Sequence, residues 1–240
     1  MSEKKDITAE HIEIISIERN DDITFTFRCT RPENLIWETG ANGHFSLKPP
    51  TGVKEIDKDF QRHMSIVSYE DEPFLEFTTR IRSSASDFKT KLSGLKKGDG
   101  LFVYGLNNRM PLIREGRNLV FITMGVAIST CRPYIRDYEV DPRGILSFSC
   151  LNIDKTGKSY FMKQMEEHTA EGFSFRFFSD RADFYKGIDE TLSKADNFYY
   201  IIGSDQFLAD TGRYLLDRGV AGDAISIDKK YGIEKLLEGK

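Results

Sequence analysis

The segment LVFITMGVAISTCRPYIRD, residues 119–137, decides the fold that we expect. Its apolar run at 119–123 is typical of a strand buried on both faces, and Gly125 then precedes a helical stretch at 132–138. This succession of strand and helix recurs toward the C-terminus. Further strands are expected at 145–151, 173–178, 198–202 and 224–227, and further helices at 160–168, 190–194 and 205–218. The alternation predicts a doubly wound parallel-sheet α/β domain over residues 114–240, with ligands at the carboxyl ends of its strands.

Residues 1–113 have a different rhythm. Apolar and polar side chains alternate at 23–29, which is typical of a strand with one buried face. Further short strands are expected at 45–47, 64–69, 74–81 and 101–104. One helix interrupts them, because apolar residues within 88–95 have helical spacing and Ser86 is placed to cap its N-terminus. The pattern predicts an N-terminal antiparallel β-barrel.

Composition excludes several classes of protein. The 240 residues carry 34 Lys and Arg against 38 Asp and Glu, and this net charge of −4 has the wrong sign for neutralising nucleic-acid phosphates. The longest apolar run is too short for a membrane span, and no apolar signal segment follows the charged N-terminus. Cys29, Cys131 and Cys150 form no C-x-x-C pair, and the histidines have no metal-ligand spacing. We therefore expect a cytoplasmic protein with no metal site that binds neither nucleic acid nor membrane.

The order of β-barrel, basic loop and open α/β sheet resembles the ferredoxin-NADP reductase superfamily, in which a flavin lies against the barrel and a nicotinamide nucleotide against the sheet. The segment Arg62-His63-Met64-Ser65 resembles the family's flavin-binding motif of Arg, any residue, an aromatic residue, and Ser or Thr. The resemblance implies that Arg62 pairs with the flavin phosphate and that Ser65 is the catalytic residue, near N5 of the ring. Met64 replaces the aromatic residue, and its sulfur can still cover the ring.

The segment 86–99 is similar to the family's phosphate-binding helix and the Gly-Asp turn after it. The resemblance implies that Ser86 and the first N–H groups of the helix receive the flavin phosphate. An ordinary helix cap is the alternative interpretation of Ser86, and both can hold together. The resemblance also assigns flavin contacts to Thr79, Arg80 and Tyr231.

The segment 121–130 resembles the family's strand and glycine-rich turn, where a nucleotide phosphate approaches the backbone. Residues 199–207 resemble the segment beside the nicotinamide. Ser179 and Arg181 resemble the pair that holds the 2′-phosphate of NADPH, whereas Asp180 could instead accept a hydrogen bond from the ribose of NADH. The resemblance thus assigns nucleotide binding to Thr123, Gly125, Val126, Ser129, Thr130, Ser179, Arg181, Gly203 and Ser204.

The nucleotide-binding segments also depart from the family's pattern. The departures replace two glycines, a proline and a cysteine, and they are Met124, Ala127, Thr130 and Ile202. The hydroxyl groups of Ser129 and Thr130 could compensate by donating to a phosphate. Asp205 would repel a phosphate unless it turns aside to cap the helix that follows.

The resemblance implies a flavoprotein reductase that transfers hydride from NADPH or NADH to a bound flavin, and electrons to ferredoxin, flavodoxin or another acceptor. FAD is the expected flavin, with FMN as the alternative. A separate electron-transfer protein is expected to dock near Arg109, Arg114 and Arg117, unless these arginines only form a solvated loop. Two alternatives stay open: a flavin-binding electron-transfer subunit or sensor with a degenerate nucleotide site, and an NAD(P)H:flavin or small-molecule reductase.

Overall fold

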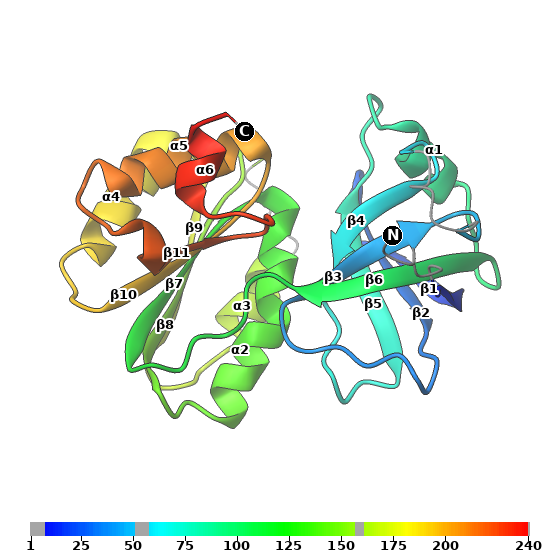
Figure 1. Ribbon diagram of the computed structural model, residues 1–240, viewed down its shortest axis with the longest axis horizontal. Helices are drawn as coiled ribbons and strands as arrows, with labels where there is room; N and C mark the ends of the chain where they lie inside the picture. The colour runs from blue at the N-terminus through cyan, green and yellow to red at the C-terminus, as the bar shows by residue number, and fades with distance from the viewer. Residues whose placement is uncertain (1–7, 51–57, 157–160, 240) are drawn as a thin grey trace, which may run out of the picture. The chain divides into compact units, whose positions relative to one another are not determined.

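The computed structural model describes residues 8–50, 58–156 and 161–239 (Figure 1). Its internal contacts divide the chain into two compact units, residues 1–108 and 109–240. The sequence pattern draws the boundary a little later, between 113 and 114. The segment in between belongs to the second unit, because Met110 is buried in its core and the Met110 carbonyl accepts a hydrogen bond from the Tyr134 hydroxyl at 2.6 Å.

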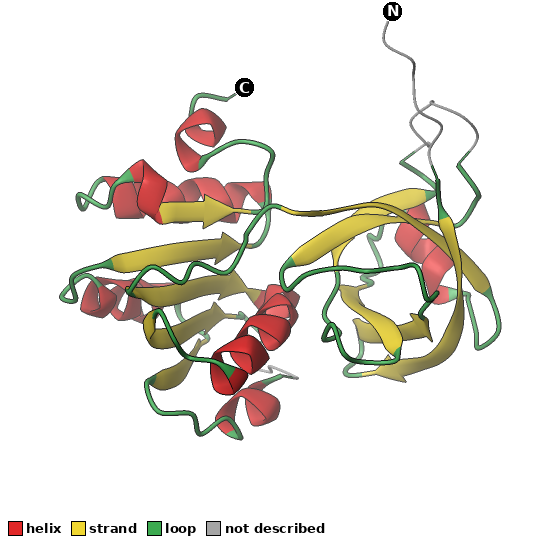
Figure 2. Cartoon of the chain, turned by 60° about the horizontal axis from the view of Figure 1, so that its bottom comes forward, coloured by secondary structure: helices red, strands yellow, loops and turns green. Residues whose placement is uncertain are grey.

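The first unit is an antiparallel sheet of six strands in the order β4-β3-β6-β1-β2-β5, curled into a half-barrel (Figure 2). The strands are β1 (Glu10–Arg19), β2 (Thr24–Thr30), β3 (Ala41–Ser46), β4 (Gln61–Ser65), β5 (Phe74–Arg80) and β6 (Gly100–Asn108). The edge strands β4 and β5 are linked just beyond Ser65, where the Val67 N–H donates to the Glu76 carbonyl at 2.8 Å. Helix α1 (Asp87–Ser93) buries Phe88 and Leu92 in the core of this unit. The predicted antiparallel half of the chain is confirmed.

Two strands of the first unit differ from the sequence-based expectation. The alternation does not single out β1, because a register shift between Ile14 and Ser16 interrupts it. Ile14 is buried on one side of this bulge, and Ile17 packs against the core on the other. β4 lies earlier than the strand expected at 64–69, so all four residues of the flavin-like motif lie on one edge strand.

Asp21 organises the turn between β1 and β2. Its Oδ1 accepts hydrogen bonds from the N–H groups of Ile23 and Thr24 at 2.8 and 2.7 Å, and its Oδ2 accepts one from the Thr24 hydroxyl at 2.9 Å. Partial burial raises the pKa of this carboxyl, but the three bonds and the charge of Arg80 together outweigh burial. The pKa of Asp21 therefore lies below its usual value.

This lowered pKa makes the turn sensitive to acid. A carboxyl whose pKa falls on folding contributes stability above its unfolded-state pKa, and the contribution is lost as the pH falls through the folded-state value. We expect Asp21→Ala to reduce the fall in melting temperature between about pH 5 and pH 2, measured by thermal scans against wild type. Asp22→Ala is the control, because the Asp22 side chain is 98% exposed. Parallel acid profiles for Asp21→Ala and wild type would contradict this role.

The second unit is a parallel sheet of five strands in the order β11-β10-β7-β8-β9. The strands are β7 (Arg117–Met124), β8 (Ile145–Ile153), β9 (Phe173–Phe178), β10 (Asn197–Ile202) and β11 (Ile225–Ile227). The helices are α2 (Cys131–Val140), α3 (Met162–Glu166), α4 (Arg181–Thr191), α5 (Asp205–Leu216) and α6 (Ile233–Leu237), with 3-10 turns η1 (Gly125–Thr130) and η2 (Gly222–Ala224). Residues of α2 and α3 pack on one face of the sheet and residues of α4, α5 and α6 on the other, which confirms the predicted doubly wound fold (Figure 2).

Phe121 lies at the centre of the core beneath α2. Its ring stacks on Phe148 and Tyr200, with centroids 4.7 and 4.4 Å away, and tilts against Tyr134 at 4.9 Å. The Tyr200 hydroxyl donates to the Pro111 carbonyl at 2.7 Å. The aromatic cluster therefore also anchors the segment that leads into β7.

The helix expected at 190–194 is longer and begins earlier, as α4. Gly187 interrupts its apolar pattern, although Phe184 and Ile188 lie one turn apart and are both buried. The glycine allows a close approach, because a Cβ at this position would lie 2.5 Å from Cζ of Phe178. Helix α3 is shorter than the helix expected at 160–168, and the first residue of that range lies outside the described residues. Within the described ranges, none of the helices combines the length and apolarity needed to cross a bilayer.

Candidate functional site

Three cationic side chains gather beside α1 in the first unit, and we call Arg62, Arg82 and Lys89 the α1 cation cluster. Burial lowers the pKa of Lys89, and the charges of Arg62 and Arg82 lower it further. The Lys89 ammonium donates to the Arg80 carbonyl at 2.8 Å, and Arg62 Nη1 donates to the Gln61 carbonyl at 2.7 Å. Like charges that bond neutral carbonyls still repel one another, so an anion placed here would be favoured.

Ser86 occupies the N-cap position of α1 but does not cap the helix with its side chain. The first turn is closed instead by the Thr90 N–H, which donates to the Ser86 carbonyl at 2.9 Å. Ser86 Oγ is buried and has no hydrogen-bond partner in the described part of the chain. An unpaired buried hydroxyl costs about 1–3 kcal/mol, which a ligand oxygen could offset. A buried hydroxyl without a partner, one helical turn before the Lys89 of the α1 cation cluster, fits a flavin phosphate.

Thr79 and Arg80 lie on β5. Thr79 is 5% exposed, and Arg80 Nε donates to the Thr24 hydroxyl at 3.3 Å. The charge of Arg80 acts on Asp21 at the β1–β2 turn. The Arg80 side chain thus supports the β2–β5 pair and its carbonyl accepts a hydrogen bond from Lys89, while the expected flavin contacts of Thr79 and Arg80 stay predictions.

The other motif residues divide between two faces of β4. Met64 is partly buried against the hydrophobic core of the first unit. His63 lies on the opposite face, where its ring meets the His44 ring edge-on at 5.1 Å. His44 in turn stacks on Tyr104, with centroids 5.1 Å apart. Ser65 ends the strand and is half-buried. Its catalytic role stays a prediction.

Sequence reasoning missed several residues around these positions. Lys89 lies three residues after Ser86, so the helix spacing contained a signal for it. No sequence signal pointed to Arg82, His44 or Tyr104, because these residues lie on other parts of the chain and come near the motif residues only through folding. Strand register places the two aromatic residues opposite each other, since His44 pairs with Tyr104 between β3 and β6.

In the second unit, the carboxyl ends of three neighbouring strands are in register. Thr123 on β7 pairs with Asn152 on β8 and with Ile202 on β10. Asn152 Nδ2 donates to Thr123 Oγ1 at 2.8 Å, and Thr123 Oγ1 donates to the Leu151 carbonyl at 3.4 Å. Thr123 is fully buried, and its hydroxyl links β7 to β8 at the carboxyl ends of the strands. Its predicted nucleotide contact stays a prediction.

The turn after β7 begins at Gly125, whose φ of +61° is the left-handed conformation that favours glycine. η1 follows and continues directly into α2. Ser129 and Thr130 are 3 and 4% exposed, and Ser129 Oγ donates to the Val126 carbonyl at 2.8 Å. The expected donation of these hydroxyls to a phosphate stays a prediction. The turn offers backbone N–H groups at its half-buried residues, Val126 and Ala127.

The turn after β10 is the second backbone turn at this edge. Ser204 caps α5, since its hydroxyl accepts a hydrogen bond from the Phe207 N–H at 3.3 Å. A Cβ at Gly203 would lie 2.6 Å from Phe207 Cδ1 and 3.4 Å from Met124 Cβ. Glycine therefore leaves room for the Phe207 ring at the start of α5, whereas a Cβ would make only an ordinary van der Waals contact with Met124.

Charged side chains follow β11 at the same edge. Asp205 turns to Lys229, with Oδ1 2.6 Å from the ammonium, so its charge is paired and Ser204 provides the cap. Arg109 and Asp228 form an ion pair at 3.7 Å with side chains 18 and 24% exposed. Burial raises the pKa of Asp228, and the charges of Arg109 and Lys229 oppose that shift.

The three arginines proposed for docking do not form one patch. Arg109 is largely buried in its ion pair with Asp228, beyond the carboxyl end of β11. Arg114 donates to the Arg143 and Asp137 carbonyls at 3.0 and 3.3 Å, near the end of α2. Arg117 begins β7, at the amino edge of the sheet. Arg109 and Arg117 thus lie at opposite ends of the parallel strands, and docking of a partner near these arginines stays a prediction.

The loop after β9 bears the residues that would select NADPH or NADH. Asp180 caps α4, and its Oδ1 accepts hydrogen bonds from the N–H groups of Ala182 and Asp183 at 2.7 and 3.0 Å. These bonds lower the pKa of Asp180. Arg181 is 60% exposed and lies 3.6 Å from the Asp210 carboxylate. Because these capping bonds hold the Asp180 carboxylate at the start of α4, we expect it not to turn toward a ribose.

Asp180→Ala tests this interpretation. We expect a melting temperature about 2 to 4 °C lower and an unchanged ratio of NADPH to NADH affinity, because the carboxylate serves the helix. Calorimetry for both nucleotides and thermal scans measure the two effects. Asp183→Ala, which removes a carboxylate from the first turn of α4 without removing the cap, is the control. A clear gain in preference for NADPH would show that Asp180 discriminates.

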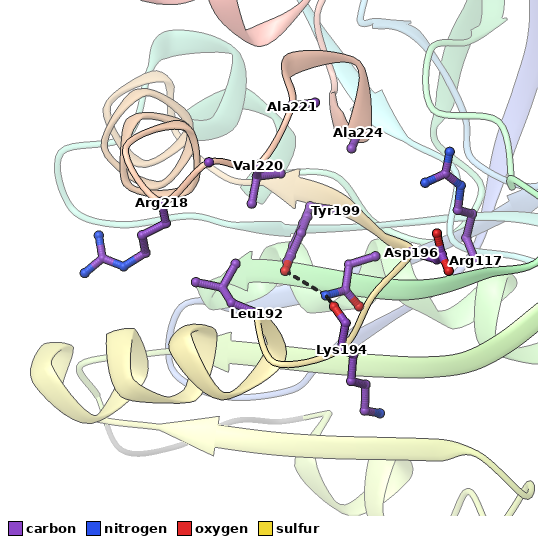
Figure 3. A pocket seen from close by; sticks show the side chains of 11 residues that line it. Arg117, Leu192, Lys194, Asp196, Tyr199, Arg218, Val220, Ala221 and Ala224 are labelled. Carbon is purple, nitrogen blue, oxygen red and sulfur yellow. Dashed lines mark hydrogen bonds between the residues drawn. The ribbon is translucent and has the colours of Figure 1, made fainter.

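A cavity of about 280 Å³ opens at the amino edge of the same sheet (Figure 3). Its cationic side chains, Arg117, Lys194 and Arg218, point in different directions in Figure 3. Arg218 is already paired with Asp189 at 2.7 Å. This cavity lies at the opposite ends of the strands from the predicted nucleotide site and lacks convergent charges.

Tyr231 lies between β11 and α6 and is half-buried, and its flavin contact stays a prediction.

Comparison with known proteins supports the architecture. No family model and no curated protein matches the sequence. A ferredoxin NADP+ reductase from Neisseria gonorrhoeae, solved with bound FAD and NADP, has a TM-score of 0.76 at 17% identity, over 93% of this chain and 99% of that one. The chain has the fold of the ferredoxin-NADP reductase superfamily.

Other solved structures share this superfamily fold. Phthalate dioxygenase reductase matches with a TM-score of 0.69 at 18% identity, over 92% of this chain and 67% of that one. A siderophore-interacting protein from Acinetobacter baumannii matches with a TM-score of 0.73 at 11% identity, over 97% of this chain and 96% of that one. These proteins share the fold but are named for different roles. The superfamily fold alone therefore does not identify an electron acceptor.

Proposed function

We propose that this chain is a flavin-dependent oxidoreductase that takes hydride from NADPH or NADH and passes electrons to an acceptor. The α1 cation cluster beside the buried, unpaired Ser86 hydroxyl is the observation that carries the proposal. When bound, FAD, or FMN in its place, supplies the redox chemistry. Arg62 and Lys89 neutralise the flavin phosphate, and Ser65 offers its hydroxyl to the ring.

The second unit would bind the nicotinamide nucleotide at the carboxyl edge of its sheet. Gly125 and Gly203 begin the two turns that let a phosphate approach the backbone there. The protein would need no general acid or base, because a bound flavin would itself supply the hydride-accepting chemistry. The contribution of the protein is to hold both partners in place and to exclude water.

The acceptor is proposed to be a separate redox carrier such as ferredoxin or flavodoxin. All three cysteines are buried. Burial and the charge of Glu76 raise the pKa of the Cys29 thiol to about 12, and burial and Cys150 raise the pKa of Cys131 well above its usual value. Thiols that stay protonated are poor ligands for an iron–sulfur cluster, so an internal cluster at these positions is disfavoured.

A second candidate is a flavin-binding subunit or sensor that does not turn over nicotinamide nucleotides. The burial of the Ser129 and Thr130 hydroxyls favours it, because these groups would otherwise replace the missing glycines as phosphate donors. The turn then depends on Gly125 and its backbone alone. An NAD(P)H:flavin or small-molecule reductase shares the first half-reaction, and a screen of acceptors separates it from the carrier-dependent enzyme.

An anaerobic titration of the flavin-loaded protein with NADPH and then NADH tests the proposal. Bleaching of the visible flavin band by either nucleotide is expected, and the faster one is the donor. A flavin that stays oxidised with both nucleotides but bleaches with dithionite would favour the subunit or sensor. A protein that retains no FAD or FMN after reconstitution would overturn the flavin site itself.

A further inference from the structure

Asn152 lies at the carboxyl end of β8 and is fully buried. Its side-chain amide reaches across to the turn that follows β7. Nδ2 donates to Thr123 Oγ1 at 2.8 Å, to the Gly125 carbonyl at 3.2 Å and to the Thr123 carbonyl at 3.4 Å. One amide group thus serves three oxygen atoms on both sides of Met124.

The orientation of this amide is fixed by its surroundings. A flipped amide would direct Oδ1 at three oxygen atoms, two of which are carbonyls that only accept. In the orientation present, Oδ1 has no hydrogen-bond partner within the described ranges. A buried amide oxygen without a partner is unfavourable, so the stabilising contribution of Asn152 comes from the hydrogen bonds that Nδ2 donates to the turn.

The turn needs such support because its sequence is restrictive. Gly125 has a φ of +61°, which is accessible to glycine, but Met124 and Ala127 stand where the resembling turns have further glycines. The Gly125 carbonyl is turned back toward Asn152, and the hydrogen bond at 3.2 Å keeps it there. A fixed carbonyl also fixes the peptide plane that carries the Val126 N–H.

We propose that Asn152 is a positioning residue that holds the Thr123–Gly125 turn in the conformation that binds the phosphate of the nicotinamide nucleotide. The inference rests on the proposed function, since it concerns the same nucleotide site. Asn152 does not touch the nucleotide. Its hydrogen bonds restrain the turn, which lacks the additional glycines and the close packing that they would allow.

Asn152→Leu tests the proposal, because leucine has the same branched heavy-atom skeleton and removes the donor without opening a cavity. Calorimetry with NADP+ and NAD+ is expected to show dissociation constants at least about tenfold higher for whichever nucleotide the wild type binds. In steady-state assays KM rises while kcat changes little, because binding is weakened and the hydride step is untouched. Amide hydrogen exchange at residues 125–127 is expected to accelerate.

Asn118→Ala is the matched control, since its amide donates to the Ala195 carbonyl at 2.8 Å at the other edge of the sheet. It should leave nucleotide affinity and exchange at the turn unchanged. If Asn152→Leu does not fold, Asn152→Ser provides the same measurements. Wild-type affinity and unchanged exchange in the variant would overturn the role of Asn152 and leave the proposed function intact. A wild-type protein that binds neither nucleotide would overturn both.

Discussion

Replacing both Arg62 and Lys89 with alanine is expected to weaken flavin binding at least about 100-fold. In the proposed site, each cation would form a charge-assisted hydrogen bond to the phosphate, worth roughly 1.5–3 kcal/mol. The partly buried Lys89 has a lowered pKa because burial and two guanidinium groups disfavour its charge, so a phosphate would relieve an existing repulsion. The loss should be smaller for either single variant, because removing one cation also removes repulsion from the other.

Fluorescence titration of the flavin-free protein with FAD and FMN measures this effect. The double variant Lys96→Ala with Lys97→Ala is the control, because these exposed lysines lie in the same unit and carry the same total charge. It should bind flavin with nearly wild-type affinity. Equal losses in the two double variants would mean that net charge, and not the α1 cation cluster, attracts the ligand.

Phe121→Ala is expected to lower the free energy of unfolding of the second unit by about 3–5 kcal/mol. The Phe121 side chain is fully buried and contacts three aromatic rings, so alanine would leave a cavity that strands on both sides cannot close. The loss also loosens Tyr200, whose hydroxyl accepts the Ile113 N–H at 2.9 Å. The segment before β7 should therefore become exposed together with the core.

Amide exchange along β7 measures the stability of the second unit separately from the first. Trp37 is the one tryptophan of the chain and is buried in the core of the first unit, so its fluorescence reports there. We expect the midpoint of the denaturant transition followed by Trp37 fluorescence to be the same in Phe121→Ala and wild type. Phe121→Leu should cost less than half as much, because leucine fills most of the volume. A loss below about 1 kcal/mol for Phe121→Ala would show that the core collapses onto the gap.

The parallel sheet was readable from sequence because its strands are apolar on both faces and end at turn residues. The bounds of β1 and α4 could not be predicted in the same way. The bulge after Ile14 shifts the apolar alternation of β1, and Gly187 interrupts the helical spacing of apolar residues in α4. Arg62 could be singled out only through the family resemblance, and Ser86 also through its place before the helical spacing of 88–95. Arg82 could not, because it joins them only when α1 packs against the sheet, and the pairing of Arg109 with Asp228 likewise depends on residues far apart in the chain.

The burial of all three cysteines has a consequence for the chemistry around a flavoprotein. Reduced flavins that meet oxygen release hydrogen peroxide, which attacks thiolates much faster than thiols. With its pKa raised to about 12, Cys29 exists almost entirely as the thiol near neutral pH, and burial and Cys150 raise the pKa of Cys131 in the same direction. Under the proposed function, the native chain should therefore tolerate the peroxide that a reduced flavin releases, and alkylating reagents should label these two positions only after unfolding.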